Sequence, residues 1–193
     1  MEDFRFVFAV VAAVVSFIAH PLYIRAILRK DEERTVPHLF TWLLSAVLAG
    51  VELFFFEAAG GRWTMFVLAG DFVGFIVITG FSFRYGKNGH FDFGDWTCLL
   101  GALVSVSVYV VFHNALWAFV MAIFADVLAL IPTIRKTYES PESEDFVAWS
   151  FTCAGNALNF LALSADVEWI YVLTIFIIDQ IVWILIFRGR KNK

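Results

Sequence analysis

The chain has 193 residues, of which 61% are hydrophobic, 18% aromatic and 17% charged, and its mean hydropathy is +0.78. Soluble domains average about 45–50% apolar and about 25% charged residues. This composition excludes a cytosolic enzyme, a nucleic-acid-binding module and a disordered chain, and it predicts a protein whose apolar surplus faces lipid. The net charge of −4 is too small to indicate a class of partner.

Seven apolar stretches, separated by short polar segments, follow one another along the chain. A helix needs about 20 apolar residues to cross the hydrocarbon core of a bilayer, and each stretch comes close to that length. The sequence therefore predicts an all-α integral membrane protein with seven transmembrane helices. In chain order they cover about 4–28, 37–57, 63–83, 95–112, 115–134, 145–164 and 169–187. The acidic start lacks the basic region of a signal peptide, so we expect the first helix to remain in the mature protein.

The basic residues define the orientation of these helices. If the N-terminus lies outside, twelve of the fourteen lysines and arginines fall in the inside connections and the C-terminal tail. Only Arg5 and Arg62 then lie outside. Because basic residues of short loops are retained on the cytoplasmic side, the sequence predicts an N-out, C-in protein of the cell membrane.

The first and fifth stretches end in related segments. One is His20-Pro21-Leu22-Tyr23-Ile24-Arg25 and the other is Ile131-Pro132-Thr133-Ile134-Arg135-Lys136. Each is followed by a charged connection with a second proline, Pro37 or Pro141. The pattern indicates three helices, one linker helix and three helices again. The predicted units are a first three-helix bundle, 1–90, a linker helix, 91–114, and a second three-helix bundle, 115–193.

A single linker helix between two triplets has a geometric consequence. Three spans take the chain to the opposite side of the membrane and the fourth returns it, so both triplets enter the membrane in the same sense. The result is a 3+1+3 parallel repeat with a pseudo-twofold axis along the membrane normal. In such a protein a binding site is expected between the halves, near the midplane.

This architecture resembles the PQ-loop and SWEET-like superfamily of small-solute transporters, over nearly the whole chain. The resemblance implies alternating access about four hinge prolines, which are Pro21, Pro37, Pro132 and Pro141. The Pro-Gln pair itself is not kept, since Leu22 and Thr133 follow the inner prolines. Sugar carriers of this family present asparagines from the third and seventh helices, where this chain has Asp71 and Asp179.

Four acidic residues lie inside the predicted spans: Glu52, Asp71, Asp126 and Asp179. A charged side chain at the bilayer centre costs about 2.5–3.5 kcal/mol on insertion scales, and it is retained where it faces a cavity or a partner. No lysine or arginine lies at a matching depth. Because burial favours the protonated form of a carboxyl group, these residues could bind a proton or a cationic group. The alternative is that they form interhelical hydrogen bonds.

Two of the expected roles concern the fifth and sixth helices. Some PQ-loop amino-acid exporters have an acidic residue linked to proton coupling on the fifth helix, so the resemblance implies this role for Asp126. On the sixth helix, Asn156 and Asn159 are three residues apart and share a face. With Trp149 on the same helix, and with Glu52, Asp71 and Asp179, they are the predicted solute-binding residues. Interhelical hydrogen bonding is the alternative role of the asparagines.

Other classes of membrane protein fit less well. A retinal protein needs a lysine at mid-membrane depth, and all five lysines lie in connections or the tail. The histidines, His20 among them, lie at span ends, and we interpret them as interfacial residues. The sequence has no paired metal-ligand spacing and no nucleophile motif, so we expect neither an enzyme nor a cofactor.

The sequence thus predicts a small-solute membrane transporter, and the resemblance implies proton coupling through Asp126. Its expected partners are the lipid bilayer and the solute, with no nucleic acid, and a homo-oligomer is compatible with the sequence. Two alternatives stay open at this point. One is a membrane receptor or assembly factor of the same architecture, and the other is a lipid-handling protein without solute transport.

Overall fold

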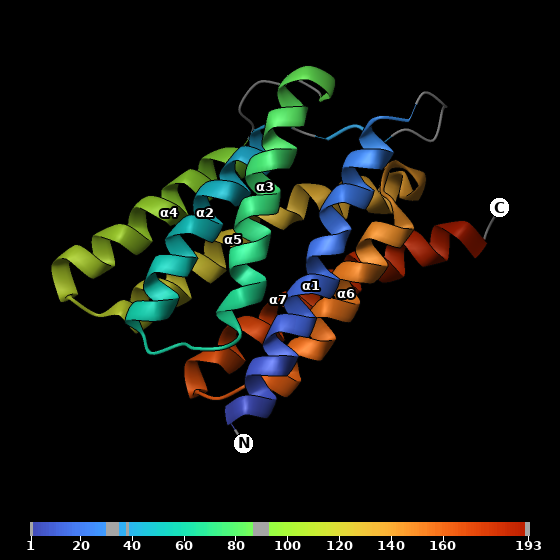
Figure 1. Ribbon diagram of the computed structural model, residues 1–193. Coiled ribbons are helices and arrows are strands. Elements are labelled where there is room, and N and C mark those ends of the chain that lie inside the picture. Colours follow the sequence, from blue (N-terminus) through green and yellow to red (C-terminus); the bar gives the residue numbers. More distant parts are fainter. Residues whose placement is uncertain (1, 30–34, 38, 87–92, 192–193) are drawn as a thin grey trace.

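The computed structural model describes residues 2–29, 35–37, 39–86 and 93–191 (Figure 1). Over these residues the chain is helical and has no strand, in agreement with the predicted all-α class. Seven α-helices and two short 3-10 helices correspond to the predicted stretches. They are α1 (Glu2–Ile27), α2 (Leu39–Ala58), α3 (Met65–Tyr85), α4 (Phe93–Phe112), α5 (Ala115–Glu139), η1 (Pro141–Ser143), α6 (Phe146–Asn159), η2 (Phe160–Ala162) and α7 (Asp166–Lys191).

Helix boundaries follow the caps and charged turns as well as the apolar stretches. At the start of α6, the Asp145 carboxylate accepts a hydrogen bond from the Ala148 N–H at 2.8 Å, which satisfies a free N–H of the first turn. Helix α5 continues beyond its predicted end at 134 to Glu139, and Arg135 and Glu139 form an i,i+4 ion pair, Nε to Oε1 3.0 Å, on its exposed last turn. Hydropathy therefore located the apolar part of α5 but not its end.

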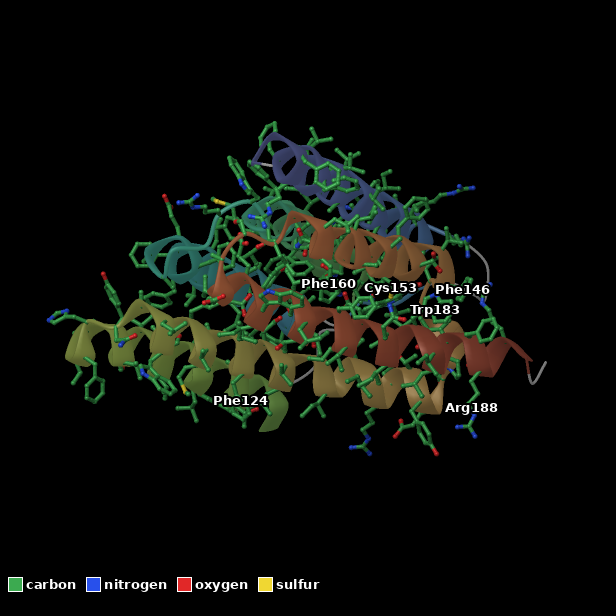
Figure 2. All side chains as sticks on the ribbon, turned by 90° about the horizontal axis from the view of Figure 1, so that it is seen from below. Phe124, Phe146, Cys153, Phe160, Trp183 and Arg188 are labelled. Atoms are coloured by element: carbon green, nitrogen blue, oxygen red, sulfur yellow. The ribbon has the colours of Figure 1, made fainter. Side chains whose placement is uncertain are left out.

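The outer surface of the bundle is apolar. In the described part of the chain, five helices (α1, α2, α3, α5 and α7) are long and apolar enough to cross a membrane. Helix α4 has a shorter apolar run, Leu99–Phe112, and α6 has 14 residues, about 21 Å of helix. Each helix exposes large apolar side chains, and Figure 2 shows one of them, Phe124, pointing away from the bundle. These features indicate a multi-pass integral membrane protein.

Six of the helices form a ring, and α4 packs outside it. Helix α3 contacts both α1 and α2, and α7 contacts both α5 and α6. The ring is completed by contacts of α1 with α6, which lie side by side in Figure 1, and of α2 with α5. Helix α4 packs against α5 and α2. The order around the ring is therefore α1, α3, α2, α5, α7, α6.

The two ends of the bundle hold different connections. One end carries the α2–α3 and α6–α7 connections, which Glu168 joins, and we name it the Glu168 end. The other carries the α1–α2 and α5–α6 connections, where Arg29 Nη1 lies 3.8 Å from Asp145 Oδ2. We name it the Glu144 end after the buried residue that precedes Asp145. Basic residues gather at the Glu144 end: Arg25, Arg29, Arg84, Arg135, Lys136, Arg188 and Arg190.

A glycine allows α1 and α6 to approach closely. A Cβ atom at Gly155 would lie 2.6 Å from Ser16 Cβ and 2.7 Å from Ser16 N, well inside van der Waals contact. Small residues permit such close approach between membrane helices. The contact places Ser16 of α1 next to the segment of α6 that carries Asn156.

Candidate functional site

A cavity of about 100 Å³ lies inside the six-helix ring. It has room for a few water molecules or one small solute. Every helix of the ring contributes to its wall. The polar lining residues are His20, Thr41, Ser45, Glu52, Asp71, Asp126, Thr133, Thr152, Asn156 and Asp179, and the aromatic ones are Tyr23, Trp42, Phe75, Trp149 and Tyr171.

The four acidic residues singled out in the sequence all line this cavity. Glu52, Asp71 and Asp179 are only 1%, 8% and 4% exposed, and Asp126 is partly exposed. They come from four different helices, so the packing of the ring brings them together. Among the described lining residues there is no lysine or arginine, and His20 is the one basic side chain. The wall of the cavity is therefore acidic.

His20 contacts Asp71 across the α1–α3 interface. Its Nε2 lies 3.6 Å from Asp71 Oδ1, and the Ser16 hydroxyl donates to the same oxygen at 3.3 Å. The imidazole fits there because residue 74 is a glycine. The Cβ atom of any other residue at this position would overlap the ring. The interpretation of His20 as an interfacial residue is therefore wrong. The spacing of Ser16 and His20 places them on one face of α1, but only the packing of α3 reveals their common partner.

Asn156 joins α6 to α7 at the cavity wall. Its Nδ2 donates to Asp179 Oδ2 at 2.6 Å, while its Oδ1 is buried and has no hydrogen-bond partner. Glu52 Oε1 is also buried and without a partner. A buried polar atom that lacks a partner is costly, and most such atoms in folded proteins are satisfied. Two residues that line one cavity therefore each have a buried acceptor atom without a partner, which a ligand or water bound there could satisfy.

Asn159 does not line the cavity, in contrast to the prediction. It is the last residue of α6, and its Nδ2 donates to the carbonyl oxygen of Thr64 at 3.5 Å. The three-residue spacing places it almost one turn beyond Asn156 along the helix axis, past the limit of the cavity. This placement fits a contact between the two halves at the Glu168 end and does not fit a solute-binding role.

Glu168, which was not among the predicted residues, connects the two halves at this end. Its carboxylate is buried and accepts from backbone N–H groups of both connections: Oε1 from Arg62 at 2.9 Å and from Thr64 at 3.4 Å, and Oε2 from Ala165 at 2.9 Å. Oε2 also accepts from the N–H and the hydroxyl of Ser164. The available sequence signal, an acidic residue in the first turn of a helix, is too common to predict this role.

An aromatic cluster of Phe56, Phe119 and Tyr171 lies between the cavity and the Glu168 end. The ring centroids are 5.3 Å apart for Phe56 and Phe119, and Tyr171 lies 6.0 Å from Phe56. Phe56 is one turn beyond Glu52 on α2, and Tyr171 itself lines the cavity. All three side chains are buried, so a packed aromatic layer lies beside the cavity toward this end.

Toward the Glu144 end the wall of the cavity continues through Tyr23, Trp42 and Trp149. The Trp149 indole Nε1 donates to Glu144 Oε2 at 3.1 Å, and Glu144 Oε1 lies 2.6 Å from Lys136 Nζ. Trp149 lines the cavity, and its ring is held by the connection between α5 and α6.

The predicted hinge prolines occupy different settings. Pro21 is exposed within α1. Pro37 lies in the segment before α2, and Pro141 begins η1, so both are in connections between helices. Helix α5 continues through position 132, but the side chain of Pro132 is outside the described residues. The hinge role of these prolines stays a prediction.

The chemistry of the cavity suits a cation or a hydrogen-bond donor. Within the described ranges no three histidine, cysteine or acidic side chains come together in a way that could hold a metal ion. No protein-family model, curated protein or solved structure matches this chain. The family resemblance of the sequence therefore stays a prediction, and the cavity itself is the basis for assigning a function.

Proposed function

We propose that this chain is a small-solute membrane transporter that works by alternating access, with the central cavity as its solute site. One observation carries the proposal: six helices enclose a cavity whose wall has four carboxyl groups and two unsatisfied acceptor atoms. Ionisable residues within membrane spans are costly, and they typically mark the paths of solutes and ions.

The helix contacts support a repeat of two three-helix units. Helix α3 lies between α1 and α2 as α7 lies between α5 and α6, and the α1–α6 contact has its counterpart in α5–α2. Exchange of the two units therefore leaves the pattern of contacts between neighbouring helices of the ring unchanged, as a pseudo-twofold axis would require. Asp71 and Asp179 lie on the corresponding helices α3 and α7, and both line the cavity. Rocking of one unit against the other would expose the cavity to each side in turn.

The ends of the cavity support a state that is closed to the outside. The Glu168 hydrogen bonds and the aromatic cluster close one end, whereas the wall continues toward the Glu144 end. The basic residues gathered at the Glu144 end favour its placement on the cytoplasmic side. In this proposal the structure represents the transporter closed at its outer end.

Asp126 is the proposed proton-coupling residue. It lines the central cavity and is less buried than the other three cavity carboxyls. Its helix, α5, contacts α2 of the other unit. A change in its charge would therefore act at the interface whose rearrangement alternating access requires.

Solute-driven proton uptake by the protein in liposomes tests the proposal. A pH-sensitive dye would be trapped inside, and amines, amino acids and sugars would be added in turn. We expect a solute-dependent pH change that Asp126→Asn abolishes. The matched control Glu139→Gln, on the exposed last turn of α5, should leave it intact.

Uptake of a labelled solute without a pH change would refute proton coupling and retain transport. Absence of uptake for every solute, by protein that is folded, would refute transport. That result would favour a receptor, an assembly factor or a lipid-handling protein.

A further inference from the structure

The unsatisfied side-chain atoms on the described wall of the cavity are hydrogen-bond acceptors. They are Glu52 Oε1 and Asn156 Oδ1. The Asn156 amide cannot turn over to present a donor without losing its 2.6 Å hydrogen bond to Asp179. A ligand that satisfies these atoms must therefore bring N–H or O–H donors.

The charge of the wall favours a cationic ligand over a neutral one. Asp71 has Ser16 and His20 as partners and Asp179 has Asn156, whereas Glu52 Oε1 has none. A neutral donor such as a polyol would leave any ionised carboxyl group of the wall without a counter-charge. A cation would supply both the donors and the charge, which a buried carboxylate needs together.

The same wall disfavours a ligand that carries its own carboxylate. An amino acid needs a cationic partner for its carboxylate, and no lysine or arginine is among the described lining residues. His20, the one basic side chain there, already lies beside Asp71. A buried carboxylate without a partner is strongly unfavourable, so the wall fits an amine better than an amino acid.

Aromatic rings complete the wall beside the carboxyl groups. Trp42 packs between Tyr23, at 5.0 Å between ring centroids, and Phe75, at 5.5 Å, and all three line the cavity. The faces of such rings attract organic cations. The carboxyl groups come from four separate helices and do not converge as metal ligands, which favours an extended organic ion over a bare metal ion.

We infer that the ligand of the central cavity is a small organic cation with N–H donors, a primary ammonium or a guanidinium, that carries no carboxylate. Glu52 Oε1 and Asn156 Oδ1 accept its N–H groups, and the aromatic rings contact its remaining surface. This inference rests on the proposed function in that the bound cation is taken to be the transported solute.

Binding of matched probes to the purified full-length protein, measured by isothermal titration calorimetry in detergent, tests the inference. Guanidinium is compared with urea, which has the same shape and no charge. Propylammonium is compared with 1-propanol, which is neutral, and with β-alanine, which adds a carboxylate to the same amine. Tetramethylammonium keeps the positive charge but has no N–H donor.

We expect guanidinium and propylammonium to bind at least about tenfold more tightly than the other four probes. Urea, 1-propanol and tetramethylammonium lack the charge-assisted hydrogen bond, which is worth at least that factor, and β-alanine brings a carboxylate that has no cationic partner. Glu52→Gln should weaken their binding by about tenfold or more. The control Glu57→Gln, an exposed position on the same helix, should leave it unchanged. The probe series on wild-type protein tests the inference even if Glu52→Gln does not fold.

Binding of urea, 1-propanol, β-alanine or tetramethylammonium as tight as that of the amines would overturn the inference, and so would absence of amine binding. Because no membrane gradient is involved, the two proposals fail separately. Amine binding without uptake into liposomes would refute transport and retain the cation site. Uptake of a sugar or an amino acid by protein that binds no amine would refute the cation site and retain transport.

Discussion

The side chains of Asn156 and Asp179 meet at 2.6 Å across the interface between α6 and α7. Both are buried, and the carboxyl oxygen takes its hydrogen from the amide, so the bond fixes the direction in which the free Asn156 Oδ1 points. The same contact therefore holds two helices of one unit together and positions an acceptor on the cavity wall.

Substitution of both partners, singly and together, should show that their contributions to the free energy of unfolding are coupled. Interhelical hydrogen bonds in membrane proteins contribute about 0.6 kcal/mol on average and up to about 1.7. We expect a coupling free energy in that range from a double-mutant cycle of Asn156→Ala and Asp179→Ala, measured by unfolding in mixed detergent micelles. Strictly additive effects of the two substitutions would show that the residues do not interact.

The close approach of α1 and α6 predicts a steric effect at one glycine. Gly155→Val would place side-chain atoms against Ser16, so one helix must shift. Overpacking of this kind typically destabilises by about 1–3 kcal/mol. Gly80→Val is the matched control, because a Cβ at Gly80 meets no atom within 4 Å. Equal free energies of unfolding for the two variants would contradict the close α1–α6 contact.

The neighbouring basic residues Arg135 and Lys136 of α5 should contribute differently to the free energy of unfolding. Lys136 Nζ lies 2.6 Å from Glu144, whose side chain is 1% exposed, whereas Arg135 pairs with Glu139 on the surface. Loss of the partner of a buried carboxylate is more costly than loss of a surface ion pair, which is worth about 0–1 kcal/mol. We expect Lys136→Met to lower the free energy of unfolding by more than Arg135→Met does. A Trp149 fluorescence change should accompany only Lys136→Met, since Glu144 also holds that indole.

Much of the helix pattern could be predicted because a membrane protein separates apolar and charged residues along its sequence. The alternation of apolar stretches with charged connections located every described α-helix, with ends that differ from the predicted ones by at most five residues. Their packing order could not be obtained in this way, since apolar surfaces that face lipid and those that face another helix have similar compositions. The α2–α5 and α1–α6 contacts, which complete the ring around the cavity, depend on that order.

The residues of the candidate site that could be identified from the sequence are those whose own chemistry is unusual for their position in an apolar stretch. A carboxyl group within an apolar stretch is costly wherever it lies, so Glu52, Asp71, Asp126 and Asp179 could be identified without knowledge of their neighbours. His20 could not, because the space for its ring depends on Gly74, which is 54 positions further along the chain.

Glu168 links the α2–α3 and α6–α7 connections by hydrogen bonds, and Glu168→Gln should loosen this link. A glutamine side chain has only one acceptor oxygen, so its NH2 group would face the N–H donors of either the α2–α3 or the α6–α7 connection. Hydrogen bonds to a charged acceptor contribute about 1.5–3 kcal/mol each. We expect faster hydrogen exchange of the backbone amides over 61–65 and 163–166, because these segments include the donors that Glu168 binds.

The control for this prediction is Asp166→Asn. Asp166 is exposed in the same first turn of α7, so the substitution removes an equal charge from the helix N-terminus but removes no contact with the α2–α3 connection. We expect little change of exchange over 61–65 in this variant. Equal acceleration in both variants would mean that the N-terminal charge of α7, rather than the link made by Glu168, closes this end. Acceleration confined to Glu168→Gln would identify the carboxylate as the contact that joins the two connections at this end.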